Sequence, residues 1–88
     1  MTVKYSKKFL KELSNIPSAH SDTIAHFVFN QLPNYHSVQE VGKIEKMKGY
    51  SKYYKIRFGK YRIGLKIHAN ELHILTIKHR KEIYNFFP

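Results

Sequence analysis

Apolar and polar residues follow two different periods in the N-terminal part of the chain. Val3 and Tyr5 alternate with polar neighbours, which predicts a short first strand. Ser6 stands where a serine can cap a helix. The apolar positions of that helix recur at helical spacing: Phe9, Leu10 and Leu13. Because proline cannot continue a helix, we expect Pro17 to end it.

A second apolar stripe at helical spacing consists of Ile24, Phe27, Val28 and Leu32. Ser18 or Ser21 is its expected cap, and Asp22 is favourable in the first turn because a helix N-terminus attracts negative charge. Pro33 stops this run. The short connection predicts a helical hairpin, and the polar, aperiodic segment 34–40 is expected to be a loop.

The second half of the chain has the two-residue period of strands. A weaker strand is expected within residues 41–48 and ends at Gly49. Three clearer strands follow at residues 53–58, 61–68 and 72–78. The short turns between them, Gly59-Lys60 and Ala69-Asn70, predict an antiparallel meander. With a short last helix beginning near Arg80, the predicted fold class is α+β.

Cations and apolar side chains occupy opposite faces of these strands. One apolar face consists of Tyr54, Ile56 and Phe58. Lys55 and Arg57 lie on the other face of that strand, and Arg62 and Lys66 lie opposite the apolar side chains of the next. The cations therefore converge on the sheet face away from the helices. The third strand is apolar on both faces, as expected of a central strand.

The net charge of +10 is concentrated in the same region. Of 16 Lys and Arg residues, twelve lie between Lys43 and Lys81, where only Glu45 and Glu71 oppose them. A positive field of this concentration favours a polyanion, either nucleic acid or an acidic protein. The simpler explanation is that lysine-rich strand edges keep a sheet soluble.

Length and composition limit the remaining possibilities. The 88 residues are enough for a single domain, residues 1–88, and too few for a second. The chain has no cysteine, which is typical of a reducing compartment, so we expect a cytoplasmic protein. No apolar run has the length of a signal peptide core or approaches the roughly 20 residues of a membrane span, so no membrane partner is expected.

This chain lacks the residues that most enzyme mechanisms require. None of the six carboxylates is expected close to the basic face, so glycosidase and two-metal phosphoryl-transfer sites have no ligands. There is no glycine-rich phosphate loop. The six histidines do not have the spacing of metal ligands, so neither a metal nor another cofactor is predicted.

Cleavage of RNA by its own 2′-hydroxyl needs only the residue types that remain. A base takes the hydroxyl proton, cations stabilise the added negative charge on phosphorus, and an acid protonates the leaving 5′-oxygen. Lys55, with Arg57, Arg62 and Lys78 nearby, is a candidate base. The alternative is that Lys55 and Arg57 only face solvent and that Tyr84 only packs.

Three segments follow one another in a characteristic order: Lys46-Met47-Lys48-Gly49, then Tyr54-Lys55-Ile56-Arg57 with Gly59-Lys60-Tyr61-Arg62, and last His79-Arg80-Lys81-Glu82-Ile83-Tyr84. In that order they resemble the RelE/ParE superfamily of bacterial toxins from type II toxin–antitoxin systems, on the RelE side. The predicted strand, helical hairpin and meander match the order of that fold, so the resemblance spans nearly the whole chain.

The resemblance implies a set of site residues. In RelE-type toxins a basic pair, an arginine, a cation at the end of the last strand and a tyrosine in the final helix cleave messenger RNA in the ribosomal A site. The catalytic residues so implied are Lys55, Arg57, Arg62, Arg80 and Tyr84. RNA binding is expected from Lys48, Lys52, Lys66, Lys78 and His79. Whether Lys78, His79 or Arg80 is the general acid stays open, because lysine replaces the arginine of some relatives at 78.

The resemblance also implies a partner, an antitoxin that wraps such toxins and holds them inactive. The net charge of +10 agrees with an acidic antitoxin. Two alternatives remain at this stage. One is a ParE-like toxin that inhibits gyrase without ribonuclease activity, a branch that shares the fold but lacks the catalytic cations and the tyrosine. The other is a plain RNA-binding module, for which the basic face would be enough.

Overall fold

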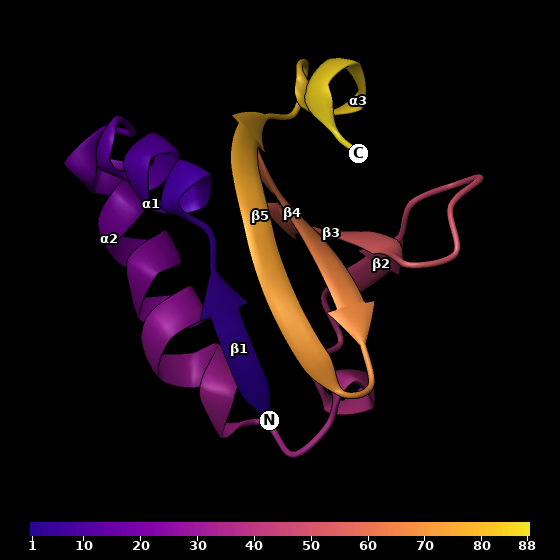
Figure 1. Ribbon diagram of the computed structural model, residues 1–88. Coiled ribbons are helices and arrows are strands. Elements are labelled where there is room, and N and C mark those ends of the chain that lie inside the picture. Colours follow the sequence, from indigo (N-terminus) through magenta and orange to yellow (C-terminus); the bar gives the residue numbers. More distant parts are fainter.

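Five strands form one sheet in the order β1-β5-β4-β3-β2 in the computed structural model, which describes residues 1–88 (Figure 1). The strands are β1 (Thr2–Tyr5), β2 (Ile44–Lys46), β3 (Tyr53–Phe58), β4 (Tyr61–His68) and β5 (Glu71–His79). β1 runs parallel to β5, and all other neighbours are antiparallel. The predicted meander and the α+β class are confirmed, and β5 is an interior strand between β1 and β4, although β4 is the middle strand of the sheet.

The strand bounds follow the alternation of the sequence closely. β3 and β4 have their predicted limits because the turns that follow them adopt positive φ angles, at Gly59 in the first turn (φ 59°) and at Ala69 and Asn70 in the second (φ 49° and 61°). β5 is one residue longer than predicted at each end. Within residues 41–48, only the three residues of β2 pair with β3.

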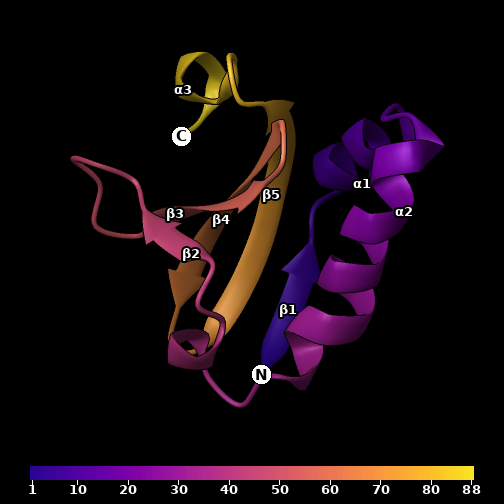
Figure 2. The same cartoon turned by 180° about the vertical axis from the view of Figure 1, so that it is seen from behind.

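Two helices, α1 (Lys7–Ser14) and α2 (Ser18–Ala25), form the predicted hairpin on one face of the sheet (Figures 1 and 2). A π-helical segment, His26–Gln31, continues α2 into the turn Leu32–Asn34, which contains Pro33. The expected loop 34–40 ends in the short turn Val38–Glu40. The last helix is α3 (Ile83–Phe86). No helix has both the length and the apolar character needed to cross a membrane.

The start of α1 confirms one prediction and corrects another. The Ser6 hydroxyl caps the helix by accepting a hydrogen bond from the Phe9 N–H at 3.0 Å. Leu10, however, does not belong to the buried stripe, because this eight-residue helix turns only Phe9 and Leu13 into the core.

The junction between the two helices differs from the prediction. α1 already stops at Ser14, and Pro17 instead occupies the N-cap position of α2. Neither Ser18 nor Ser21 is therefore the cap, and Asp22 lies beyond the first turn. Proline can start α2 because its fixed φ suits a helix N-terminus, where its missing N–H is no loss.

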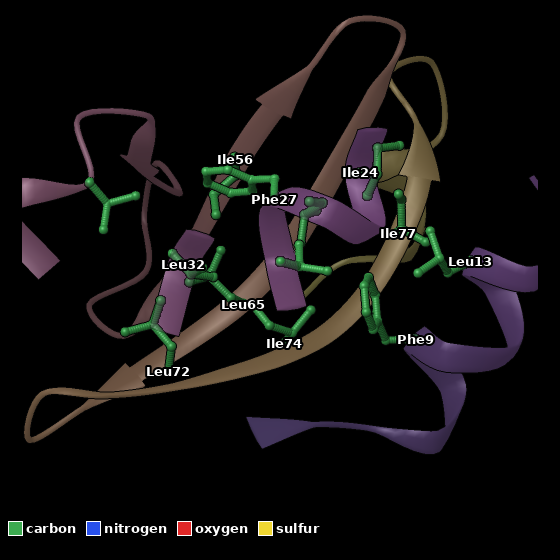
Figure 3. Packing of buried hydrophobic residues seen from close by; sticks show 13 residues of the cluster. Phe9, Leu13, Ile24, Phe27, Leu32, Ile56, Leu65, Leu72, Ile74 and Ile77 are labelled. Atoms are coloured by element: carbon green, nitrogen blue, oxygen red, sulfur yellow. The ribbon is translucent and has the colours of Figure 1, made fainter. Parts of the chain in front are cut away.

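The main core fills the space between the hairpin and the sheet (Figure 3). All four residues of the predicted second stripe are buried there: Ile24, Phe27, Val28 and Leu32. A bulge in β5 adjusts the alternation, since Leu65 pairs with Ile74 and Gly64 with Thr76, leaving Leu75 without a partner in β4. As a result Ile74 and Ile77, three residues apart, both reach the same core.

A smaller apolar cluster on the opposite face of the sheet anchors α3. It consists of Met47, Ile83 and Phe87. The Phe87 ring lies so close over β4 that a Cβ atom on Gly64 would be 2.8 Å from its Cδ2. Gly64 thus lets the C-terminal segment contact the sheet, and this contact brings Tyr84 to the basic face.

Candidate active site

Three cations form a row across three strands of the sheet, and we call Arg57, Arg62 and Lys78 the cation row. Arg57 on β3 is paired in register with Arg62 on β4, which is paired with Lys78 on β5. Like charges directly opposite each other destabilise a sheet, so this arrangement costs folding free energy. It also concentrates positive potential on the face away from α1 and α2, as the alternation predicted.

Lys55 and Tyr84 meet beside the cation row, although they are 29 residues apart in the chain. The Lys55 Nζ donates a hydrogen bond to the Tyr84 hydroxyl and lies 4.6 Å from the centre of its ring. Tyr84 is 65% exposed, so packing alone does not account for its position. A proton donor or acceptor pair with access to solvent is therefore available next to three cations.

The turn between β3 and β4 fixes the direction of Arg62. Its Nη1 donates to the carbonyl oxygens of Gly59 at 2.7 Å and of Tyr61 at 2.9 Å. A guanidinium has five N–H donors, so the group held in this way still has donors for a phosphate.

The end of β5 brings two further predicted residues to the same turn. The Arg80 N–H donates to the Lys60 carbonyl oxygen at 2.7 Å, while the Arg80 side chain is exposed. The His79 ring lies against Tyr61, and its Nδ1 accepts a hydrogen bond from the Lys81 N–H at 3.2 Å. A hollow of about 350 Å³ beside the cation row is lined in part by Tyr61, Lys78 and His79.

The remaining predicted RNA-binding lysines lie away from this group. Lys48 and Lys52 are exposed on the loop between β2 and β3, which projects from the sheet (Figures 1 and 2). Lys66 pairs with Tyr53 at the beginning of β3, whereas Arg57 lies near its end. The structure thus divides the predicted cations into one set around Lys55 and Tyr84 and a second, separate set.

Two carboxylates adjoin the basic face, which corrects the expectation that none would. Glu45 is paired in register with Lys55, and its Oε1 lies 3.9 Å from the Arg57 Nε. Glu12, on α1, places its Oε2 2.6 Å from the Lys78 Nζ. Pairing β2 with β3 in the sequence would have revealed Glu45, whereas the approach of Glu12 depends on how α1 packs against β5.

Glu12 stays ionised beside Lys78. Burial alone would raise the pKa of the Glu12 carboxyl group, but hydrogen bonds from Lys78, Thr76 and the Ile77 N–H, with the charge of Lys78, outweigh it and hold the pKa below the ordinary 4.5. Lys78 is therefore present in the row as part of an ion pair, whereas Arg62 has no carboxylate partner.

Comparison with known proteins identifies related chains over the full length. The family model of the ParE toxin of type II toxin–antitoxin systems, parDE, matches residues 3–84. A protein of Methanocaldococcus jannaschii named Toxin RelE3 is 35% identical over 89 residues, which cover 100% of both chains.

Solved structures give the same result for the fold. A chain in the crystal structure of a RelB–RelE antitoxin–toxin complex from Methanococcus jannaschii matches with a TM-score of 0.78 and 32% identity, covering 97% of this chain and 99% of that one. A chain of the toxin–antitoxin complex RelBE2 from Mycobacterium tuberculosis matches with a TM-score of 0.71 and 20% identity, covering 90% and 96%, which supports the fold alone.

Proposed function

Because this chain belongs to the ParE toxin family of type II toxin–antitoxin systems, we propose that it is a RelE-type toxin, an endoribonuclease that cleaves messenger RNA in the ribosomal A site. The observation that carries the proposal is the contact between Lys55 and Tyr84 beside Arg57 and Arg62. A base, an acid and phosphate-binding cations are the groups that cleavage by the 2′-hydroxyl requires.

The reaction needs no metal or other cofactor in this proposal. A base removes the proton of the 2′-hydroxyl, the new 2′-oxygen–phosphorus bond forms, and the bond from phosphorus to the 5′-oxygen breaks. The products are a 2′,3′-cyclic phosphate and a 5′-hydroxyl, which receives its proton from the acid. Arg57 and Arg62 stabilise the additional negative charge on phosphorus, because arginine binds phosphate oxygens in a bidentate manner.

Lys55 is the base and Tyr84 positions it or transfers the proton in this scheme. Glu45 is a second candidate base, since its carboxylate lies opposite Lys55 and near Arg57. The exposed Arg80 and its neighbour His79 are the candidates for the acid, whereas the pairing of Lys78 with Glu12 argues against Lys78.

The partner in this proposal is an acidic antitoxin encoded beside the toxin. The support is the RelB–RelE antitoxin–toxin complex that contains a chain 32% identical to this one, together with the net charge of +10. Opposite charges would speed the encounter and favour covering of the basic face.

The test is induction of the chain in bacteria, with mapping of new RNA 5′ ends on translated messages. Arg62→Ala, and separately Lys55→Ala combined with Arg57→Ala, are expected to abolish growth arrest in folded protein. Each lost cation at the reacting phosphate should reduce the rate on the order of 10²-fold or more. Growth arrest like that of the wild type, caused by a folded double variant, would refute the site assignment.

Two further variants in the same series separate the candidate bases and the competing function. If Lys55 is the base, Glu45→Gln should reduce cleavage only mildly. If the Glu45 carboxylate is the base, Glu45→Gln should be as inactive as Lys55→Ala. Growth arrest without new RNA ends, accompanied by gyrase inhibition, would favour the ParE-like alternative for which the matching family model is named.

A further inference from the structure

Glu12 replaces a missing strand along β5. β1 ends at Tyr5, opposite Ile74, so the edge of β5 beyond this point has no strand neighbour on that side. The Glu12 Oε1 fills part of the gap by accepting hydrogen bonds from the Thr76 hydroxyl at 2.5 Å and from the Ile77 N–H at 3.3 Å. The Thr76 hydroxyl and the Ile77 N–H thus hold the Glu12 carboxylate in place independently of any cation.

The other oxygen of Glu12 holds Lys78. The two side chains are only 18% and 23% exposed, and Oε2 lies 2.6 Å from Nζ. A pair this close and this sheltered fixes the position of the lysine far better than a surface salt bridge would. Lys78 consequently has little freedom to follow a phosphate group.

Lys78 in turn contacts α3. Its Nζ lies 5.0 Å from the centre of the Phe86 ring, a distance at which a cation attracts the face of an aromatic ring. Ile83 and Phe87 anchor α3 on the sheet, but Phe86 is 57% exposed, so the contact with Lys78 rather than burial orients its ring. Tyr84, two residues earlier in the same short helix, touches Lys55.

We infer that Glu12 is a positioning residue for Tyr84: through Lys78 and Phe86, α1 fixes the orientation of α3 and keeps the Tyr84 hydroxyl against Lys55. The inference rests on the proposed function for its catalytic consequence, but not for the structural coupling itself. It assigns Lys78 to the support of the site and leaves phosphate binding to Arg57 and Arg62.

The coupling is tested by observing Tyr84 in the absence of RNA. Protein labelled with 3-fluorotyrosine should give one ¹⁹F signal for each of the seven tyrosines, and the signal lost in Tyr84→Phe belongs to Tyr84. Glu12→Gln keeps a carbonyl oxygen for Thr76 and Ile77 but removes the charge that holds Lys78. We expect the Tyr84 signal to shift and broaden.

Asp22→Asn is the matched control, because Asp22 is an exposed carboxylate on α2, away from α3, that makes no ion pair. It removes the same charge and should leave the Tyr84 signal in place. Phe86→Leu is the second variant: it keeps the Glu12–Lys78 pair, removes the ring and does not open the core, so it decides the question if Glu12→Gln fails to fold. It should also displace the Tyr84 signal.

Cleavage on programmed ribosomes gives the second measurement. We expect the single-turnover rate of Glu12→Gln to fall between about 10- and 100-fold, as for a misplaced catalytic group, with an unchanged ribosome concentration for half-maximal rate. Glu12→Gln combined with Tyr84→Phe should be no slower than Tyr84→Phe alone. A Tyr84 signal and a rate for Glu12→Gln equal to those of Asp22→Asn would overturn the inference. If the wild-type protein cuts no RNA but Glu12→Gln still displaces the Tyr84 signal, the proposed function is overturned and the structural coupling stands.

Discussion

Removing the hydroxyl group of Tyr84 distinguishes a chemical role of this side chain from a packing role. Tyr84→Phe removes one oxygen atom from a ring that is 65% exposed, so the free energy of unfolding should change little. If the hydroxyl transfers a proton or orients Lys55, single-turnover cleavage should fall about 10²-fold. Tyr50→Phe is the control, since Tyr50 is exposed on the loop between β2 and β3 and makes no hydrogen bond through its hydroxyl. Equal rates for both variants, with only Tyr84→Ala impaired, would assign Tyr84 to packing.

The seating of α3 on the sheet depends on Gly64. Alanine normally stabilises a strand interior relative to glycine by roughly 0.5–1 kcal/mol. Here the added Cβ would lie 2.8 Å from the Phe87 ring, and overpacking of this kind costs about 1–3 kcal/mol. We therefore expect Gly64→Ala to lower stability in urea unfolding and to slow cleavage by displacing Tyr84. In a Phe87→Leu background the same change should be neutral or stabilising. A stabilised Gly64→Ala single variant would mean that the ring does not rest on the sheet.

The strands could be predicted from the sequence because their alternation and their turn residues agree. β3 and β4 begin and end as predicted, and the shared face of Lys55, Arg57 and Arg62 follows from the period alone. The N-cap of α2 could not be predicted in this way, since a proline and a serine compete for neighbouring positions. The contact of Glu12 with Lys78 could not be predicted either, because the sequence of a helix does not indicate which strand end its carboxylate will contact after packing.

The molecule as a whole presents its candidate site on an open sheet face, and this limits what it can do to RNA by itself. Tyr84 and Arg57 are exposed, and only the short helix α3 and the projecting loop between β2 and β3 border this face. A free RNA strand would therefore rarely adopt the in-line geometry that 2′-hydroxyl attack requires. Alignment of reactants can contribute several kcal/mol, and a message held in the ribosomal A site already has a fixed path. We therefore expect purified protein to cleave naked RNA slowly or not at all, yet to cut programmed ribosomes within the codon being read. Binding to naked RNA should still occur at low salt and weaken as salt rises, because the net charge of +10 attracts any polyanion. Equal cleavage rates on naked and ribosome-bound RNA would instead identify a free ribonuclease, for which the basic face alone provides the alignment.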